Sequence, residues 1–534
     1  MIVRRSLFAG LALTLAAVMP PAVPGLAATV GVEPPAGQAA PHMVNADVGR
    51  TVALLRRSFQ AIHDRTIQER GVPDLALAGV RGLVALDDAL SLKINGQTLQ
   101  IAAGGVMVLG VALPRGEAAA DWAETVAVVA RDLRRYSPAL AEMAAADVHT
   151  AILNAALEGF DVHTRYDPPV TADAQRSKRN GFSGVGIRYE REGNGIRILE
   201  VLRHGPSDGV LRADDLVTHV DGQMVADMDI SDMSHHLRGP RHSLVVLTVI
   251  RAADPARTVM VRRDRVVPDS VVAEVRNGVA LVRIRRFNIA TSDSVRAALQ
   301  EAEAAEGPLA GAVLDLRGNP GGLLDQAYGV ADLFLDDGIL VTTRGRHPAS
   351  LQSYSATKGD ILGGRPLAVL VDGRSASSAE ILAAALKDSG RATLLGTNSY
   401  GKGTVQTIVR LPNDGELKLT WSRFHSPAGY AIQDLGVMPS VCLSGMGHDP
   451  AGEGVVSAAG GVAADTMGAL MPQAIADRWR TVPFEAAEER LALRDTCRRE
   501  ARSGLDFDID AALAFIRDAA GHTQHATLKP GAGR

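Results

Sequence analysis

The sequence has few aromatic residues and little net charge. Aromatic side chains make up 4% of the 534 residues, and the formal net charge is −4 at pH 7. No long run of Lys and Arg occurs, so neither attraction to phosphates nor stacking on bases is supported. These absences argue against nucleic acid as a partner.

Cysteine is also scarce, with only Cys442 and Cys497 present. No Cys-x-x-Cys pair and no His-Glu-x-x-His helix occurs, so the sequence indicates no zinc site and no other cofactor. In an oxidising compartment a lone pair of cysteines tends to oxidise. We therefore predict a disulfide that ties the C-terminal region back to Cys442; two buried free thiols or an intermolecular bridge are the alternatives.

Long apolar runs are missing except near the start of the chain. Arg4 and Arg5 precede an apolar run from Leu7 to Val18, and small residues follow at Ala28. This pattern predicts a signal peptide over residues 1–28 and a periplasmic or secreted protein with no membrane span after cleavage. A retained membrane anchor is the alternative, although the run is short for a bilayer span.

The rest of the chain predicts a multidomain α/β protein. Hydrophobic residues make up 46% and charged residues 22%, which is ordinary globular composition. After a proline-rich linker (29–44), apolar residues recur at helical spacing from Val48 to Ile62, and we predict a mainly helical N-terminal domain over 45–168. Within it, Asn95-Gly96 predicts the turn of a hairpin. Residues 179–265 alternate short strands with turns and predict a small β-rich domain.

Residues 270–442 alternate strand and helix, which predicts an α/β core with crossover helices. In such sheets ligands bind at the carboxyl ends of strands, and three polar loops occupy such positions: 315–322, 372–378 and 396–404. The region 443–534 reads as an extension, with a Gly/Ala linker (444–465) and helical pattern over 469–518. Its helices are expected to carry Phe484, Ala487 and Leu491 on one face.

Two of these loops carry a candidate nucleophile and base. Ser377 lies at the start of a helix, where free N–H groups and the helix dipole can stabilise an oxyanion. A capping role for this serine is the alternative. A serine needs a base, and no histidine flanks it; Lys402 could serve if burial removes its proton. The alternative is a surface lysine in a turn.

Other catalytic motifs are incomplete. Gly396-x-x-x-x-Gly401-Lys402 resembles a phosphate-binding loop, but Gly403 stands where Ser or Thr should follow, and a strand rather than a helix is predicted next. Ser355-x-x-Lys358 lacks the helix and the companion motifs of penicillin-binding enzymes, and no Gly-x-Ser-x-Gly elbow occurs. Nucleotide binding and an α/β-hydrolase are therefore not predicted.

Four motifs occur in the order found in the C-terminal processing peptidases, also called tail-specific proteases. They are Leu314-Asp-Leu-Arg-Gly-Asn-Pro-Gly-Gly322, Ser375-Ala-Ser377, Gly401-Lys-Gly-Thr-Val-Gln406 and Ser426-Pro-Ala-Gly-Tyr-Ala-Ile-Gln433. The sequence resembles that family from about residue 154 to 441. The resemblance implies a serine peptidase that acts on polypeptide tails.

The resemblance also implies roles for individual residues. It makes Ser377 the nucleophile and Lys402 the base, at the family's usual separation of 25 positions. Gln406 would orient the lysine, since positions four apart on a regular strand point to the same side. The N–H groups of Gly322 and Ser378 would hold the oxyanion, with neighbouring Gly321 as an alternative.

Two departures from the family pattern are visible. The family usually has alanine where Ser378 stands, a change that a main-chain donor tolerates. Tyr430 stands where the family often has arginine, which puts substrate-side contacts there in doubt.

The β-rich domain resembles the PDZ domain of the same family. Its candidate carboxylate-binding loop contains five residues: Phe182, Ser183, Gly184, Val185 and Gly186. Successive N–H groups in such a loop can capture a terminal carboxylate while the peptide adds as a strand. The alternative is a β module that only packs against the peptidase.

We therefore predict an exported serine endopeptidase that cleaves unfolded or tail-exposed polypeptides through a Ser/Lys dyad, with PDZ-like recognition of substrate C-termini. The alternative is a non-catalytic PDZ-type scaffold derived from a protease. The sequence does not predict the oligomeric state.

Overall fold

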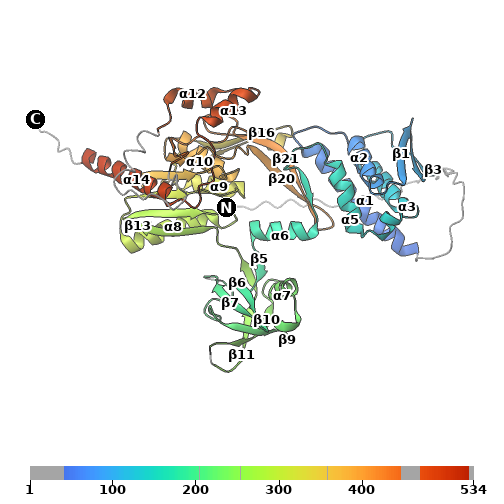
Figure 1. The fold of residues 1–534 in the computed structure, drawn as a ribbon, viewed down its shortest axis with the longest axis horizontal. Coiled ribbons are helices and arrows are strands. Elements are labelled where there is room, and N and C mark those ends of the chain that lie inside the picture. Colours follow the sequence, from blue (N-terminus) through green and yellow to red (C-terminus); the bar gives the residue numbers. More distant parts are fainter. Residues whose placement is uncertain (1–40, 204, 253, 358, 447–469, 528–534) are drawn as a thin grey trace, which may run out of the picture. The chain divides into compact units, whose positions relative to one another are not determined.

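The computed structural model describes residues 41–203, 205–252, 254–357, 359–446 and 470–527 (Figure 1). The predicted signal peptide (1–28) lies outside the described residues, as does most of the two predicted linkers (29–44 and 444–465). None of the helices in the described ranges is long and apolar enough to cross a membrane.

The N-terminal region combines helices with a small antiparallel sheet. Its elements are α1 (Pro41–Arg65), α2 (Val72–Val84), β1 (Leu90–Asn95), β2 (Thr98–Ala103), β3 (Val106–Ala112), α3 (Ala119–Leu133), α4 (Pro138–Glu142), α5 (Ala145–Ala156), β4 (Arg165–Asp167) and α6 (Pro169–Asn180). Asn95 pairs with Thr98 across the predicted turn, which confirms the hairpin. The sequence did not predict β3, which extends the hairpin to three strands.

The apolar stripe of α1 is buried as its spacing predicts. Leu55, Phe59 and Ile62 pack in one core with residues of α2, α3 and α5. The same core includes Val409 of β20 (Thr404–Arg410), the strand that follows the candidate lysine loop, and Leu417 and Leu419 of the neighbouring strand β21 (Glu416–His425). The N-terminal region therefore supports the sheet from which the candidate base projects.

The β-rich region has its own core. Its elements are β5 (Phe182–Gly184), β6 (Ile187–Glu192), β7 (Gly195–Val201), β8 (Leu216–Val220), β9 (Gln223–Met224), η1 (Val225–Asp227), α7 (Ile230–Leu237), β10 (Leu244–Ile250), β11 (Arg257–Arg262) and β12 (Asp264–Val266). The main sheet has the order β11-β10-β8-β7-β6, so β6 is an edge strand. It begins at Ile187, directly after Gly186, whose φ of +73° is favoured by glycine and rare in a strand.

The α/β core is built around a six-stranded sheet. Its elements are β13 (Val271–Arg276), β14 (Val279–Ile284), α8 (Thr291–Glu306), β15 (Gly311–Asp315), α9 (Leu324–Asp332), β18 (Leu367–Val371), α10 (Ser378–Asp388), β19 (Thr393–Gly396) and β22 (Val441–Cys442). The order is β13-β14-β15-β18-β19-β22, with β13 antiparallel and the others parallel. The predicted crossover pattern of strand and helix is thus confirmed.

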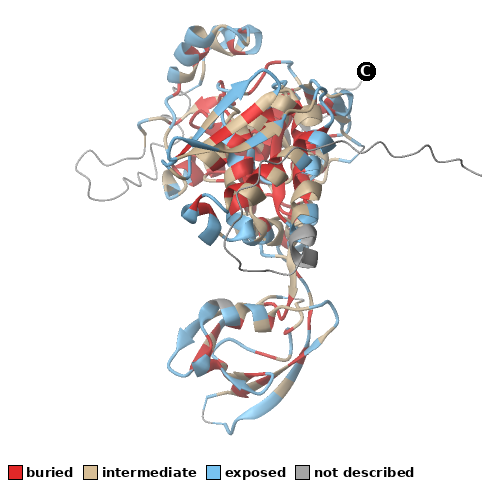
Figure 2. Ribbon diagram, turned by 90° about the vertical axis from the view of Figure 1, so that its right-hand side faces the viewer, coloured by how far each residue is buried: buried red, intermediate tan, exposed pale blue. Residues whose placement is uncertain are grey.

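The parallel strands of this sheet are buried on both faces (Figure 2). Alternate residues of a strand point to opposite faces: Ala312 and Leu314 of β15 pack with α8, α9 and α10. Val313 packs on the other side, with Ile516 of α14. Such double coverage explains why the parallel strands are almost wholly apolar.

A second sheet carries the lysine loop. It comprises β16 (Ile339–Gly345), β17 (Gln352–Ser355), β20 (Thr404–Arg410) and β21 (Glu416–His425) in the order β17-β16-β21-β20, with β4 also paired to β21 and the short η2 (Pro348–Ser350) between β16 and β17. The strand predicted after Lys402 is confirmed as β20. In this described part of the chain, a strand rather than a helix follows the loop 396–402, which therefore lacks the helix of a phosphate-binding loop.

The C-terminal region contains α12 (Gln473–Thr481), α13 (Ala487–Asp495) and α14 (Asp506–Thr527). The expected apolar face is wrong, because Phe484 precedes α13 and Leu491 is 56% exposed. Arg490 and Leu493 of α13 are the buried residues instead. The predicted disulfide between Cys442 and Cys497 is confirmed, with the two Cα atoms 5.9 Å apart.

Candidate active site

The candidate nucleophile lies on a sharp turn between a buried strand and a helix. Ser377 follows β18 and immediately precedes α10, and its φ is +56°. A non-glycine residue in this region is strained, and such strain is held only where the surroundings determine it. The N–H of Ser377 donates to the Glu380 carboxylate at 2.7 Å. The serine thus occupies the helix-capping position and still lines a cavity.

The loop after β15 lies directly against this turn. A Cβ atom on Gly321 would come within 2.9 Å of the Ser377 side chain, and one on Gly322 within 2.0 Å of the Phe287 carbonyl oxygen. Only glycine permits these close approaches. The turn and the loop therefore pack backbone against backbone.

The hydrogen bonds separate the two candidate oxyanion donors on this loop. The N–H of Gly321 donates to the Asn319 side chain at 2.8 Å. Within the described ranges, the N–H groups of Gly322 and Ser378 have no hydrogen-bond acceptor. The Ser378 hydroxyl donates to the Gly322 carbonyl at 3.0 Å and so links the two residues. Gly322, rather than Gly321, thus has the available N–H.

Lys402 lies on the loop between β19 and β20, partly buried. Burial, and next the positive charge of Arg165, lower the pKa of the Lys402 ammonium, while the negative charges of Glu380 and Asp161 oppose the shift. A lowered pKa increases the neutral fraction near pH 7, which is the form that can accept a proton.

The carboxylate of Glu380 joins the nucleophile turn to the lysine loop. One oxygen accepts from the N–H groups of Ser377 and Lys402, at 2.7 and 2.9 Å. The other accepts from the Ser399 hydroxyl and the Gly401 N–H, at 2.5 and 2.6 Å. Glu380 is fully buried. The sequence analysis gave this residue no role, because the motif alone does not show that its side chain turns back on the backbone.

Gln406 lines the same cavity as Lys402, but regular strand alternation does not relate the two residues. β20 begins only at Thr404, and its register with β21 shifts between Val405 and Gln406. Regular alternation from Lys402 therefore fails. The Gln406 amide donates to the hydroxyls of Thr404 and Thr420, at 2.9 and 3.1 Å.

The serine, the lysine, the glutamine and the two loop glycines line one cavity of about 730 Å³. The predicted residues that line it are Gly321, Gly322, Ser377, Ser378, Lys402 and Gln406. Its lining is rich in cations: Arg165, Lys178, Arg179, Arg286 and Lys418 join Lys402. Asp325 is the one carboxylate among the described lining residues. The cavity can therefore hold a peptide against a serine, a lysine and two N–H donors in a positively charged environment.

A segment just before β4 contributes residues that the sequence analysis did not assign. The Thr420 hydroxyl, which receives a bond from Gln406, donates in turn to Asp161 at 3.0 Å. Burial and then the charge of Lys402 lower the pKa of His163. The sequence contained one indication that these residues belong to the site, because they lie within the region that resembles the peptidase family. They are far from Ser377 and Lys402 along the chain, so their proximity could not be predicted.

The candidate tail-binding loop is separate from this cavity. Phe182, Ser183, Gly184, Val185 and Gly186 are not among the residues that line it. Tyr430, the position where the sequence put substrate-side contacts in doubt, is not among them either and is buried in the core. Among the described residues, no cluster of His, Cys, Asp and Glu could hold a metal ion.

Comparison with known proteins defines the class. Residues 278–442, which contain the parallel sheet and the three loops, match the model of peptidase family S41. The Carboxy-terminal-processing protease of Bartonella bacilliformis is 36% identical over 297 residues, covering 54% of this chain and 68% of that protein. The Carboxyl-terminal-processing protease of a Picosynechococcus species is 33% identical over 288 residues, covering 52% and 69%.

A solved structure, the photosystem II D1 C-terminal processing protease, aligns at 30% identity over 55% of this chain and 80% of that one, with a TM-score of 0.33. On the similarity to the two curated relatives, the chain belongs to the C-terminal processing peptidases, which are serine-type peptidases.

Proposed function

We propose that the protein is an exported endopeptidase that cleaves unfolded or tail-exposed polypeptides with a Ser377/Lys402 dyad. The observation that carries this proposal is the convergence of four groups on one cavity: the serine, the partly buried lysine and the available N–H groups of Gly322 and Ser378. The reaction requires no metal or nucleotide. Export rests on the predicted signal peptide, which places the mature protein in the periplasm or outside the cell.

In the proposed reaction, the Ser377 hydroxyl attacks the carbonyl carbon of the scissile bond and passes its proton to neutral Lys402. The negative charge that develops on the carbonyl oxygen is held by the N–H groups of Gly322 and Ser378. Lys402 then protonates the departing amine, leaving an acyl-serine. Water attacks this ester and loses its proton to the lysine, which returns the proton to the Ser377 oxygen as the ester C–O bond breaks and the acid product leaves. Gln406 and Glu380 position the lysine loop.

Several features of the β-rich region support its proposed role in binding substrate C-termini. Strand β6 is at the edge of its sheet, where an extended peptide can add as a further strand. The Tyr189 hydroxyl on β6 hydrogen-bonds to Ser234 on α7 at 2.9 Å, so the helix lies next to this edge strand. The N–H groups of Val185 and Gly186 have no acceptor among the described residues and could receive a terminal carboxylate.

Hydrolysis of unfolded casein tests the proposal. We expect the wild type to cleave casein and Ser377→Ala to be inactive, whereas Ser389→Ala, an exposed serine at the other end of α10, retains activity. Mass spectrometry of the products should show cuts within the chain. A wild type that binds C-terminal peptides but hydrolyses nothing, like Ser377→Ala, would favour the non-catalytic scaffold.

A further inference from the structure

The chain beyond the disulfide contacts all the loops of the candidate site. We call residues 497–508 the bracing segment. The N–H of Gly373, on the nucleophile loop, donates to the Glu500 carbonyl at 2.7 Å. The Arg499 guanidinium donates to the carbonyl of Tyr400, on the lysine loop, at 2.8 Å. No residue of the bracing segment lines the cavity, so these contacts support the loops without meeting the substrate.

Arg317, on the oxyanion loop, makes the densest of these contacts. Its guanidinium donates to the carbonyls of Arg502 and Leu505, at 3.0 and 2.7 Å. It also pairs with the carboxylates of Asp315 at 2.9 Å and Asp508 at 3.2 Å. The side chains of Arg317 and Asp508 are 1% and 0% exposed. The orientation of Arg317 therefore depends on a carboxylate from the C-terminal region.

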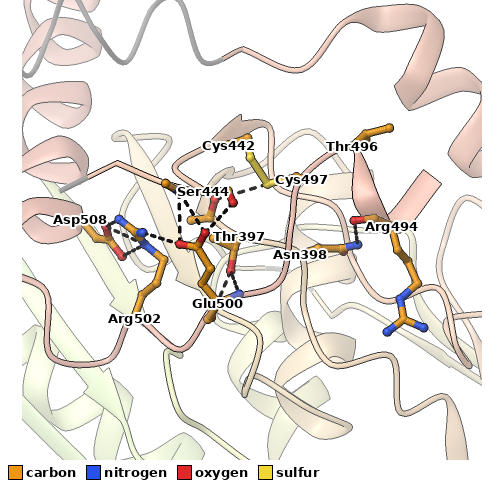
Figure 3. Close-up of a disulfide and its surroundings, with 12 residues drawn as sticks. Thr397, Asn398, Cys442, Ser444, Arg494, Thr496, Cys497, Glu500, Arg502 and Asp508 are labelled. Atoms are coloured by element: carbon orange, nitrogen blue, oxygen red, sulfur yellow. Dashed lines mark hydrogen bonds and ion pairs between the residues drawn. A yellow bond between two sulfur atoms is a disulfide. The ribbon is translucent and has the colours of Figure 1, made fainter. Parts of the chain in front are cut away.

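Arg502 connects the same carboxylate to the nucleophile loop. Its guanidinium pairs with Asp508 at 2.7 Å and with Glu500 at 2.9 Å (Figure 3). The main-chain N–H of Arg502 donates to one oxygen of the Asp372 carboxylate at 2.9 Å. The other oxygen of Asp372 accepts from the N–H of Gly318, on the oxyanion loop, at 2.9 Å. One chain of hydrogen bonds thus runs from the bracing segment to both loops.

We propose that Arg502 and Asp508 are positioning residues that hold the oxyanion loop through Arg317 and Asp372, with the Cys442–Cys497 disulfide keeping the bracing segment in place. The inference rests on the proposed function. Removing the charge of Asp508 leaves two buried arginines with only one carboxylate each, Asp315 for Arg317 and Glu500 for Arg502, which is costly where water is excluded.

The effect should appear in catalysis rather than in binding. An oxyanion donor acts on charge that develops only in the transition state, so its misplacement lowers kcat more than it changes KM. A displacement of about 1 Å far from the chemistry can already cost about a hundredfold in rate. A purely structural role would instead lower the fraction of folded enzyme and leave each folded molecule unchanged.

The test is Asp508→Asn, which keeps the shape of the side chain. We expect kcat for a short peptide to fall by about tenfold or more, with KM within about twofold. The affinity for a peptide boronic acid, whose adduct with serine mimics the tetrahedral intermediate, should fall in parallel. Glu489→Gln is the control, because its carboxylate forms an exposed pair with Arg478 in the same region. We expect it to match the wild type.

The outcomes separate the two proposals. If Asp508→Asn melts like the wild type and retains kcat and boronate affinity, the positioning role is overturned. The same holds if it loses activity only in proportion to its unfolded fraction. If Ser377→Ala hydrolyses the peptide as fast as the wild type, the proposed function itself fails.

Reduction of the disulfide in the folded wild-type enzyme is a second test, and it does not require a variant to fold. We expect kcat to fall on reduction and recover on reoxidation, with KM little changed. A Cys442→Ser, Cys497→Ser double variant should show the low kcat with or without reductant. A fully reduced enzyme with wild-type kcat would overturn the role of the disulfide.

Discussion

Lys402 can accept a proton only in its neutral form, and its surroundings favour that form. Burial and the neighbouring Arg165 lower its pKa. Activity should therefore rise with pH through this lowered pKa and level off while exposed lysines are still protonated. Arginine stays protonated, so Lys402→Arg should lower kcat by about a hundredfold or more.

The measurement is a pH profile of kcat/KM on a peptide without ionisable residues, for the wild type and the arginine variant. Lys93→Arg is a suitable control, since Lys93 lies on β1 of the N-terminal sheet. Near-normal activity of Lys402→Arg would remove Lys402 from the mechanism.

Glu380 should matter to both stability and rate. Each of its oxygens accepts two hydrogen bonds, and a glutamine would place an NH₂ group opposite two of those donors. We expect Glu380→Gln to lower the free energy of unfolding by about 2 kcal/mol. It should also lower kcat, because the N–H groups of Ser377 and Lys402 share this carboxylate.

Urea unfolding and peptide kinetics check the Glu380 prediction, with Glu301→Gln on the exposed side of α8 as the control. Equal stability and rate for the two variants would show that the carboxylate is dispensable.

At this scale the sequence predicts residues within short motifs better than contacts between them. Ser377 and Lys402 could be recognised because each follows a buried strand in a polar loop. The role of Glu380 could not, because it depends on a side chain that turns back toward two loops. Gln406 was expected to face Lys402 along a regular strand, but Lys402 precedes β20, and the extra residue Trp421 in β21 shifts the register between Val405 and Gln406, as in a bulge. Bulges depend on pairing with another strand, which local sequence does not encode.

Among the elements, β6 and α7 give the most direct test of tail binding. A mutation of Gly186 would be a poor test, since a Cβ there would come within 2.9 Å of Pro206. Ser234→Arg instead places a large side chain on α7 where it meets β6. We expect it to lower kcat/KM for a long substrate with a free C-terminus by about fivefold or more, with a short peptide unaffected.

His235→Arg is the matched control for this variant, because His235 is the next residue of α7 and is exposed. Equal losses on long and short substrates would mean that the β-rich region only stabilises the peptidase.

The periodicity of apolar residues predicts that a helix or strand forms, but it does not predict against which other element that helix or strand packs. The predicted alternation of short strands and turns appears as β5 to β12, and the predicted alternation of strand and helix as β13 to β22. The helical pattern near the C-terminus was also recognised. Its buried face was misread at Phe484 and Leu491, because α13 buries an arginine and packs through few apolar residues. That α14 covers one face of the catalytic sheet depends on long-range packing that no local pattern reveals.

At the scale of the whole molecule, the net charge of the chain does not reveal the positive charge of the cavity. The chain carries a formal charge of −4, yet the cavity lining is mostly cationic. Among its cations, Arg165, Arg179 and Lys418 are in ion pairs of the described residues, and Arg286 is not. A peptide with acidic residues beside the scissile bond should therefore bind better than a neutral one, and less so at high salt.

Arg286→Gln should raise KM for the acidic peptide by about two- to fivefold and leave the neutral peptide unchanged. Arg285→Gln is the control, because the neighbouring Arg285 is exposed and does not line the cavity. The two peptides should be compared at low and high ionic strength. No preference between them would show that the local field is screened.

The disulfide also changes what a break in the chain would mean. Cys442 and Cys497 close a covalent ring, so a single cut anywhere between them leaves both fragments attached. For a peptidase exposed to its own activity, such a nick would not release α14 from the sheet that it covers. The nicked protein would run as one band on a denaturing gel without reductant and as two bands with it. It would stay active until a thiol reached the bond.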